Sequence, residues 1–340
     1  MATVGTNYNT LPDLVARTEP DGSFARRIAD RVGRTNQLLQ FLPFVRSNKV
    51  DGNTIVQATK LPTVGYIKYN KAPTKSKGET VQVTDSVARL KVFSDVDCEL
   101  ADSHVDKEAF RASEDMLFVE AMNQQVASDL IYSNVTTTPE KFQGLAPRYG
   151  TASQTRNNFG YYMIDGGGSG SDNTSIWVLR LDETDGVHGI FGKAGKAGLS
   201  MTDHGKVWGP DADGNDMQWY RSEYRWEVGL QVRRPGAAVR ICNIDKSNLT
   251  GETSAADLSK LLQRACKLIE NGPGRVVILM NKTTQAWLEI QASQETTLGL
   301  HNLKDTFGED MMAFRGKPII MHEAITVAEA TVSGTFQTDI

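Results

Sequence analysis

The longest regular pattern of hydrophobic and polar positions in the chain lies between residues 106 and 133. This stretch contains neither Gly nor Pro, and its Ala, Glu, Gln, Leu and Met residues favour helix. The sequence therefore predicts one continuous helix over residues 106–133. At the usual rise per residue such a helix is about 42 Å long.

Apolar side chains of this helix fall on two nearly opposite sides when successive residues are placed about 100° apart. One stripe contains Phe110, Leu117, Ala121 and Tyr132, and the other contains Val119, Met122, Val126 and Leu130. A surface helix of a globular protein has a single apolar stripe. The two stripes predict that the helix is covered on both sides.

Residues 51–96, which precede the helix, alternate between apolar and polar positions as strands do. The predicted strands are 54–59, 64–69, 80–83 and 88–92. Between them, residues 71–78 contain three lysines and no acidic residue, so this tip stays solvated. A long two-stranded ribbon is marginally stable alone, so we expect it to lie on the surface of a partner.

Residues 1–50 contain little that could form a core, apart from a weak amphipathic pattern over 22–44. They carry seven basic and four acidic residues, a net charge of +3, whereas the whole chain carries −4. We expect an N-terminal arm that packs against another surface.

Strands and helices are both expected after residue 133, which makes the predicted class α+β. The strict alternation of residues 224–232 and the turn at 233–236 predict a long β-hairpin over 219–244. Ser254 and Asp257 form a capping box for a helix over 254–270, and Asn281 caps another helix. The remaining predicted strands are 175–181, 275–280 and 316–321.

Charge and hydropathy exclude several classes of protein. A net charge of −4 argues against a dedicated nucleic-acid-binding protein, whose basic face usually dominates the total. The chain lacks an apolar run of about 18 residues, so no membrane span is expected, and its start lacks the pattern of a signal peptide. Cys98, Cys242 and Cys266 are far apart and are expected to be buried free thiols of a protein made in the cytosol.

The sequence does not predict a metal site. The five histidines, at positions 104, 188, 204, 301 and 322, are scattered, whereas metal ligands cluster. Residues 211–216 resemble a calcium loop, but Asp216 and Ser222 stand where an EF-hand has Gly and Glu. A turn is the favoured interpretation, because Asp, Asn and Gly are also turn residues.

Nucleotide binding and catalysis are disfavoured as well. Residues 189–196 resemble a phosphate loop, but the spacing between the glycines is one residue too long and Ala197 replaces the Ser or Thr that would hold magnesium. Acidic neighbours of Cys98 would raise the pKa of its thiol and so would not activate it. We therefore expect no catalytic, cofactor-binding or metal-binding residue and no enzymatic activity.

The order of these segments, a loose arm, a basic-tipped ribbon, one long helix and then α+β material, resembles the Hong Kong 97-type major capsid proteins of tailed phages. The closest resemblance is to the epsilon-fifteen-type coat proteins. The stretches that carry it are MATVGTNYNTLPDL, LPTVGYIKYNK, QVTDSVARLKVFSDVD, AFRASEDMLFVEAMNQQ, PEKFQGLAPRY, DNTSIWVLRLDETDGVHGIFGKAGKAGL and YRSEYRWEVGLQVRRPGAAVRICNID. In addition, RVVILMNKTTQAWLEI followed by FRGKPIIMHEAI is similar to the A-domain of the wider family.

The resemblance implies a division into an N-terminal arm (1–50), an E-loop (51–96), a P-domain (97–250) that includes the spine helix 106–133 and the hairpin 219–244, and an A-domain (251–340). One departure concerns chain order. In the type member the long P-domain strands follow the Gly-x-Pro strand, whereas here the candidate pair precedes it. No residue could be assigned to crosslinking between subunits.

The resemblance further implies a structural protein that forms the icosahedral shell around the double-stranded DNA of a phage. Its partners would be further copies in hexamers and pentamers, scaffolding, portal and decoration proteins, and DNA bound non-specifically at the inner face, with no membrane. The protein would reside in the virion, and in the host cytoplasm during assembly. Arg26, Arg27, Arg31 and Arg34 would lie at the inner side or in a groove between subunits, or would pair with acids of the body.

Two other functions remain open at this stage. An encapsulin-like compartment has the same fold but encloses cargo enzymes. A hydrolase or a glycan-binding β protein is suggested by abundant carboxylates and by Trp177, Trp208, Trp219 and Trp226, although aromatics at alternating strand positions are more often part of a core.

Overall fold

The computed structural model describes residues 36–103, 106–210, 214–247, 249, 256–294, 300–304 and 310–337. Predictions that concern residues 1–35, including Arg26, Arg27, Arg31 and Arg34, lie outside this range, as do those for His104, Asp211 and Ser254 and for the side chain of His301. The described chain forms two compact units. Unit 1 contains residues 89–126 and 196–227, and unit 2 contains 35–88, 127–195 and 228–340. Residues 97–250, predicted as one P-domain, thus contribute to both units, and the predicted domain limits stay a prediction.

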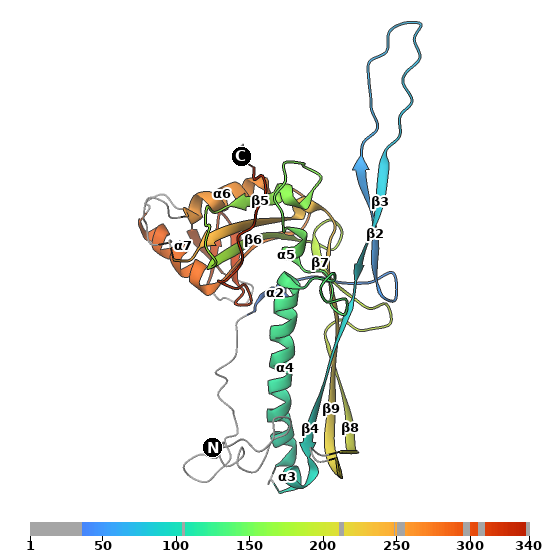
Figure 1. Cartoon of the computed structure of the whole chain (residues 1–340), viewed down its shortest axis with the longest axis vertical. Helices are drawn as coiled ribbons and strands as arrows, with labels where there is room; N and C mark the ends of the chain where they lie inside the picture. The colour runs from blue at the N-terminus through green and yellow to red at the C-terminus, as the bar shows by residue number, and fades with distance from the viewer. Residues whose placement is uncertain are drawn as a thin grey trace. The chain divides into compact units, whose positions relative to one another are not determined.

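The predicted long helix is confirmed as α4, Lys107–Tyr132, whose residues up to Val126 belong to unit 1. Asp106 precedes it and accepts a hydrogen bond from the backbone N–H of Ala109 at 3.0 Å, as an N-cap does. The other elements of unit 1 are β4 (Ala88–Asp97), the short α3 (Cys98–Asp102), β8 (Leu199–Pro210) and the first part of β9 (Asp216–Val232). β9 lies between β8 and β4 in the sheet (Figure 1).

The prediction that α4 is covered on both sides is wrong for the subunit alone. Met122, Val126 and Leu130 of the second stripe are at most 4% exposed. Leu117 of the first stripe is 40% exposed, and the neighbouring Met116 is 72% exposed. Phe110 of the first stripe packs against Val96, Cys98 and Tyr220, so the open part of this stripe among the described residues lies around Leu117.

The predicted hairpin over 219–244 is also wrong. β9 pairs antiparallel with β8, from Leu199 opposite Trp226 to Pro210 opposite Asp216. The second predicted strand, β10 (Ala238–Asp245), instead pairs antiparallel with β6 (Asn173–Leu181) and parallel with β5 (Met163–Asp165). Between β9 and β10 the chain forms the short 3₁₀ helix η2, Pro235–Ala237. Alternation identifies a strand and its buried face but does not identify its partner, which explains the error.

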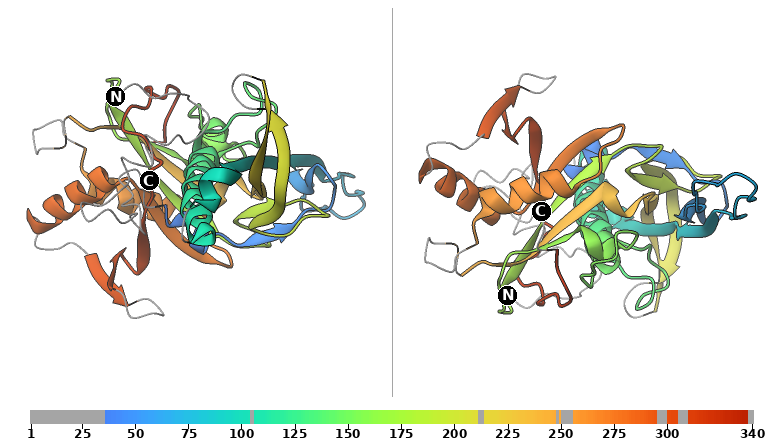
Figure 2. Two further views of the ribbon diagram at one scale, coloured as in Figure 1. Left: turned by 90° about the horizontal axis from the view of Figure 1, so that it is seen from below. Right: turned by 90° about the horizontal axis from the view of Figure 1, so that it is seen from above.

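Unit 2 is built on a mixed sheet in which β6 and β10 are buried over nearly their whole length. Its strands follow the order β12 (Leu300–Lys304), β13 (Asp310–Phe314), β14 (Lys317–Met321), β11 (Arg275–Met280), β6 and β7 (Val187–Phe191). The helices of this unit are α2 (Leu38–Phe41), α5 (Leu145–Arg148), the 3₁₀ helix η1 (Phe159–Tyr162), α6 (Leu258–Leu268) and α7 (Lys282–Gln294). Figure 2 shows α6 and α7 beside the strands of unit 2.

The capping residues in the sequence predicted the start of α7 correctly and the start of α6 less accurately. Asn281 caps α7 as predicted, since its Oδ1 accepts a hydrogen bond from Thr283 N at 2.8 Å. The helix predicted over 254–270 starts later than expected. Asp257 is its N-cap, accepting a hydrogen bond from Lys260 N at 3.0 Å, and α6 begins at Leu258. The strands predicted over 175–181, 275–280 and 316–321 are confirmed as β6, β11 and β14.

The later part of the predicted N-terminal arm belongs to the core of unit 2. Leu38 and Leu42 are 1% and 5% exposed. β1 (Phe44–Arg46) pairs parallel with β7, and the ring of Phe44 covers Gly189, where a Cβ would lie 2.5 Å from the ring. The chain from Asn36 onward is thus part of the folded unit, while the predicted limit of the arm at residue 50 stays a prediction.

The ribbon consists of β2 (Gly52–Lys60) and β3 (Glu79–Ser86), which pair antiparallel (Figure 1). The predicted strand over 64–69 is wrong, because residues 61–78 form an irregular loop, which we call the tip loop. Pro62 and Pro73 lack the N–H that a ladder needs, and Asn70 has a φ of 63°. The predicted strand over 88–92 is the start of β4.

Residues 326–337, the C-terminal strap, lie against β6, β10 and the loop at Ala152. The Glu329 carboxylate is the main anchor and is 7% exposed. It accepts hydrogen bonds from Tyr132 Oη at 2.5 Å and from Ser175 Oγ, and it forms an ion pair with Arg240 at 2.8 Å. Three separate segments of unit 2 are thereby joined to the strap.

Candidate assembly surfaces

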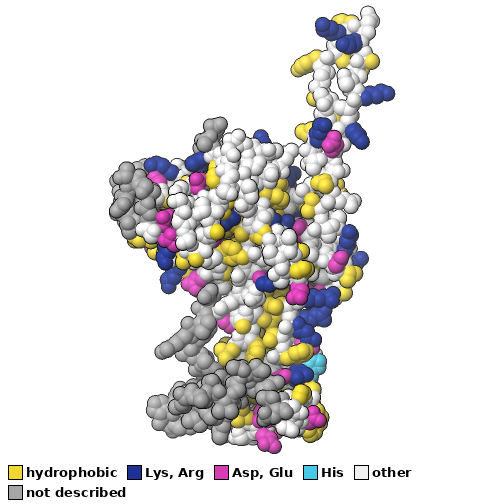
Figure 3. Space-filling model, viewed as in Figure 1, with side chains coloured by type: hydrophobic (Ala, Val, Ile, Leu, Met, Phe, Trp, Pro, Cys, Tyr) yellow, Lys and Arg dark blue, Asp and Glu magenta, His cyan; other side chains and the backbone are white. Residues whose placement is uncertain are grey.

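The tip loop presents apolar side chains directly to solvent. Every residue from 61 to 78 is exposed. The exposed fractions reach 81% for Leu61, 90% for Val64 and about 100% for the two tyrosines, Tyr66 and Tyr69. Figure 3 shows hydrophobic side chains alternating with lysines on this part of the ribbon. Fully exposed apolar clusters of this kind mark interaction sites.

The charge of the tip loop is entirely positive. It contains Lys68, Lys71, Lys75 and Lys77 and no acidic residue. Hydrogen bonds within it are Ser76 Oγ to Thr63 O at 2.8 Å and Lys71 N to Lys68 O at 3.2 Å. An ion pair at the start of the loop, Lys60 with Glu79 at 3.5 Å, is exposed. The loop is thus a cationic and apolar surface.

At its other end the ribbon enters a buried polar network, the ribbon socket, formed by Asn53, Asp85, Arg148, His188 and Gln231. Asn53 and Asp85 are cross-strand partners in the ribbon. Gln231 is fully buried on β9. Its Oε1 accepts a hydrogen bond from Asn53 Nδ2 at 2.7 Å, and its Nε2 donates to Asp85 Oδ2 at 3.2 Å and to Asn53 O at 3.2 Å.

Arg148 and His188 complete the ribbon socket. Arg148 Nη2 donates to Asp85 Oδ1 at 2.7 Å, and both side chains are more than 90% buried. His188 Nε2 lies 3.1 Å from Gln231 Oε1, which is an acceptor, so this ring nitrogen carries the proton. Burial, followed by the nearby Arg233, lowers the pKa of His188, which keeps the ring neutral near pH 7.

Gly229 of β9 allows the ribbon to approach the body this closely, and Gly52 allows the two strands of the ribbon to pair at its base. A Cβ at Gly52 would lie 2.3 Å from the carbonyl oxygen of Asp85. A Cβ at Gly229 would lie 2.5 Å from the carbonyl oxygen of Ser86. A side chain at Gly229 would push the base of the ribbon away from the body, whereas one at Gly52 would disturb the pairing of β2 with β3.

One face of the unit 1 sheet carries paired charges. Lys91 binds Glu223 at 2.9 Å, which also lies 2.8 Å from His204 Nε2. Hydrogen bonds from Lys91 and then from His204 lower the pKa of Glu223. Arg221 and Asp95 form a two-point ion pair at 2.7 and 2.8 Å. Such a surface is locally neutral and solvated.

The opposite face of this sheet meets α4 and leaves apolar side chains open beside it. Tyr220 and Tyr224 of β9 are buried there, with Arg111 of α4 over the ring of Tyr220. On the outer strand β8, Met201 is 54% exposed and Trp208 is 67% exposed. Together with the exposed Met116 and Leu117 of α4, unit 1 offers its own uncovered apolar surface.

Several of the histidines, cysteines and tryptophans considered in the sequence are buried in the part of the chain that the structure describes. Across the part of the chain that the structure describes, His, Cys, Asp and Glu form no group of three suited to a metal ion. His188 and His322 are buried, and Trp177 and Trp219 are at most 4% exposed in the core. Burial raises the pKa of the Cys98 thiol more than the acids Asp102 and Asp97 do. No described helix is long and apolar enough to cross a membrane.

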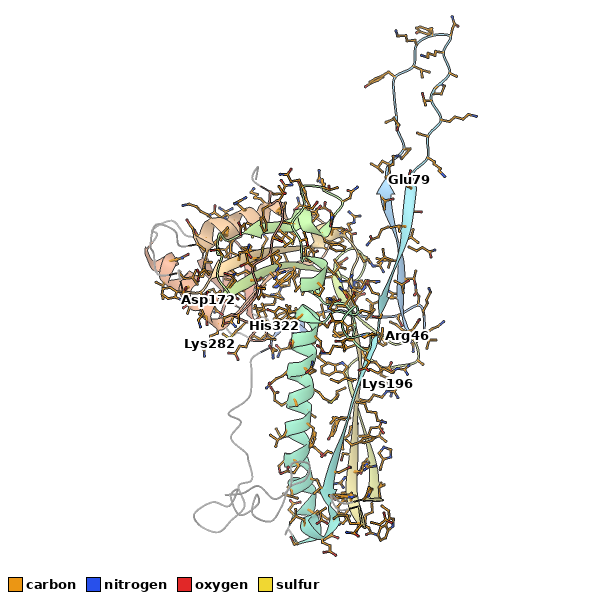
Figure 4. All side chains as sticks on the ribbon, in the orientation of Figure 1. Arg46, Glu79, Asp172, Lys196, Lys282 and His322 are labelled. Carbon is orange, nitrogen blue, oxygen red and sulfur yellow. The ribbon has the colours of Figure 1, made fainter. Side chains whose placement is uncertain are left out.

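Figure 4 shows Glu79 at the outer end of the paired ribbon strands β2 and β3, and Arg46 near the base of this ribbon. The ribbon socket was missed in the sequence. Its single local signal is Gln231, a polar residue on a buried-type strand. Its partners are up to 178 residues away along the chain, a separation that periodicity does not bridge.

Comparisons with known proteins agree with this architecture. A family model described as major capsid protein GP7 matches residues 19–333. A chain in the structure of bacteriophage Epsilon15 is 29% identical, with a TM-score of 0.77 over 98% of this chain and 99% of that chain. The bacteriophage JBD30 capsid matches at 11% identity and a TM-score of 0.49, over 93% of this chain and 99% of that one.

An encapsulin from Synechococcus elongatus matches less well, with 13% identity and a TM-score of 0.40 over 69% of this chain and 96% of that one. No curated protein sequence matches the chain.

Proposed function

The chain belongs to the major capsid protein GP7 family and has the Hong Kong 97-type fold of a tailed-phage coat protein, and from this premise we propose how its surfaces build the shell. Many copies close into an icosahedral lattice of hexamers and pentamers around double-stranded DNA. The observation that carries this proposal is the tip loop, whose apolar side chains are uncovered in a single subunit.

The tip loop docks on a neighbouring copy. Its exposed tyrosines and aliphatic side chains gain burial there, and apolar burial is worth about 25 cal/mol per Å². Its four lysines need acidic partners that the loop itself lacks. Residues 97–108 of unit 1 contain five acids and one lysine, and a second copy therefore offers a surface of complementary charge.

Several further partners belong to the same proposal. Scaffolding, portal and decoration proteins would act during or after assembly. Packaged DNA would meet the inner face non-specifically, with Arg26, Arg27, Arg31 and Arg34 at that face or in a groove between subunits. The protein would assemble in the host cytoplasm and would carry out no catalytic step.

Electron microscopy of the purified protein tests the proposal. Closed shells that contain nuclease-resistant DNA when made during infection are the expected result. Shells that enclose a protein cargo and no DNA would instead identify an encapsulin-like compartment. A monomer that binds a glycan saturably and never assembles would contradict a structural role altogether.

A further inference from the structure

The ribbon meets the body of unit 2 through few side chains, and most of them are polar. Facing the body, β2 contributes Asn53, Ile55 and Gln57, of which Ile55 is the one apolar side chain under 10% exposed. Gln57 Nε2 donates to Arg233 O at 2.7 Å. Asn53 and Asp85 enter the ribbon socket. The attachment is therefore made mainly of hydrogen bonds.

The bonds of the ribbon socket are mutually dependent. Gln231 uses its oxygen for Asn53 and His188 and its nitrogen for Asp85 and the backbone of Asn53. Arg148 occupies the other oxygen of Asp85. Because these donors and acceptors are buried in one cluster, rotation of the ribbon would leave several of them unsatisfied, which is costly. Apolar packing lacks this directionality.

Small changes of angle at the base of the ribbon become large displacements at its tip. From Asn53 to Asn70 the chain can reach at most roughly 60 Å when extended, so a tilt of about 10° moves the tip by up to roughly 10 Å. A displacement of that size would carry the tip loop past its docking surface. Accurate docking of the tip loop thus requires that the base of the ribbon keeps one preferred orientation relative to the body of unit 2.

We propose that Gln231 and Asp85 are positioning residues for shell assembly, which fix the direction in which the ribbon presents its tip loop to the neighbouring copy. This inference rests on the proposed docking of the tip loop. Neither residue contacts the neighbour, and both act through the ribbon. Buried polar groups of this kind specify one arrangement more than they raise the free energy of unfolding.

Three variants test the role. Gln231→Met keeps the length of the side chain and removes every side-chain hydrogen bond made at position 231. The exchange variant, Gln231→Glu with Asp85→Asn, keeps one carboxylate and one amide and reverses the direction of the bond between them, but it gives up the bond to Asn53 O. The control is Thr84→Val, which removes the 2.8 Å hydroxyl contact between Thr54 and Thr84 inside the ribbon and leaves the socket untouched.

The first measurement uses the isolated subunit. Spin labels at Ser76→Cys on the tip loop and Lys282→Cys on α7, in a background with Cys266→Ser, report the distribution of distances between ribbon and body. We expect a broader distribution for Gln231→Met, a narrower one than this for the exchange variant, and a distribution as narrow as the parent for Thr84→Val. A parent-like distribution for Gln231→Met overturns the proposal, and so does loss of the folded subunit in that variant.

The second measurement is the protein concentration at which shells form. We expect it to rise roughly tenfold or more for Gln231→Met, the effect of losing a buried hydrogen bond to a charged group, and to return toward the parent value in the exchange variant. Unchanged assembly despite a broadened distribution overturns the positioning role. If the parent itself forms no shell, the proposed function fails, while the spin-label result still decides whether the socket orients the ribbon.

Discussion

At the scale of single residues, His322 makes unit 2 sensitive to acid. Its ring is fully buried, and Nε2 lies 3.1 Å from the carbonyl oxygen of Ala127. Burial lowers the pKa of His322 to about 4 from the ordinary value of 6.5. The folded protein therefore keeps this ring neutral at pH values where the unfolded chain already binds a proton.

The stability that depends on neutral His322 is fully present above pH 6.5 and is lost as the pH falls from there toward about 4. At 1.36 kcal/mol per pKa unit, the loss approaches roughly 3 kcal/mol. We expect the free energy of unfolding of the parent to fall more steeply between pH 7 and pH 4.5 than that of His322→Asn. Denaturant titrations of both proteins at the two pH values measure the difference, and identical slopes would show that the ring is not the titrating group.

The anchor of the C-terminal strap gives a second prediction at this scale. Replacing Glu329 with Ala leaves Arg240 buried at about 5% exposure without its carboxylate. Removing one partner of a buried ion pair costs about 3–5 kcal/mol. A shift of the urea midpoint measures the loss, and the exposed Glu140→Ala serves as the control. Equal midpoints for the two variants would rule out an anchoring role for Glu329.

Sequence reasoning succeeded for residues whose partners are local and failed for those whose partners are distant. Asn281 was recognised as a helix cap because its side chain accepts a hydrogen bond from Thr283, which is only two residues away in the sequence. Asn53, Asp85 and Gln231 were not recognised as a cluster, because the fold alone brings them together. The sequence correctly predicted that the pKa of the Cys98 thiol is raised. The main cause is burial of the thiol, which the neighbouring residues in the sequence do not reveal.

At the scale of elements, the two faces of α4 should respond differently to truncation. Leu130 is fully buried, so Leu130→Ala should cost about 2–5 kcal/mol of the free energy of unfolding. Leu117 is 40% exposed, so Leu117→Ala should change it by roughly 0.5 kcal/mol or less in the isolated subunit. Thermal or urea unfolding of the free subunit measures both.

The control for these variants is Gln124→Ala, which removes a hydrogen bond from Gln124 to Glu120 and truncates no apolar side chain of either stripe. If Leu117→Ala unfolds as easily as Leu130→Ala, both faces are covered within the subunit and the corrected description of α4 fails. If it folds normally but assembles poorly, its face is covered by a neighbour in the shell.

The ribbon gives a prediction about assembly without a change in folding. Replacing Lys71, Lys75 and Lys77 with Glu reverses the charge of the tip loop, where every residue is exposed. Exposed ion pairs contribute about 0.2–1 kcal/mol each, so the triple variant should weaken assembly most at low salt and leave the melting temperature of the subunit unchanged. Light scattering during assembly at two salt concentrations measures this effect, and equal shell yield would exclude an electrostatic contact.

Element types were predicted more successfully than element pairings. The long helix was correct because its apolar periodicity is strong, and the strands 175–181 and 275–280 were correct because each is a short, nearly continuous apolar run. The hairpin over 219–244 was wrong because β10 finds a better-buried position between β5 and β6. The predicted strand over 64–69 is wrong because apolar and polar residues alternate there, but these residues pair with no neighbouring strand.

At the scale of the whole molecule, the tip loop should change its environment on assembly. In a single subunit its backbone is exposed throughout residues 61–78 and makes few internal hydrogen bonds. Amide hydrogen exchange should therefore be fast in the free subunit and slower in the shell, where a neighbour covers the loop. Exchange followed by peptide mass analysis of both states measures this, and fast exchange in the assembled shell would contradict docking.

The resemblance to phage coat proteins was the strongest large-scale prediction, since the family and the fold are both confirmed. The division of the chain into units was harder to predict, because each unit is built from segments that are far apart in the sequence. Composition does not indicate which of these segments pack together. Unit 1, for example, combines residues 89–126 with residues 196–227.

This interlacing has a consequence for folding kinetics. The described part of unit 1 cannot form until β4 meets β9, and the chain between them runs through residues 127–195 of unit 2. Contacts of such long sequence separation require closure of a large loop and slow the folding of a domain. Unit 1 therefore cannot be completed before residue 227 has been synthesised, and unit 2 cannot be completed before its last segment, which starts at residue 228, has followed.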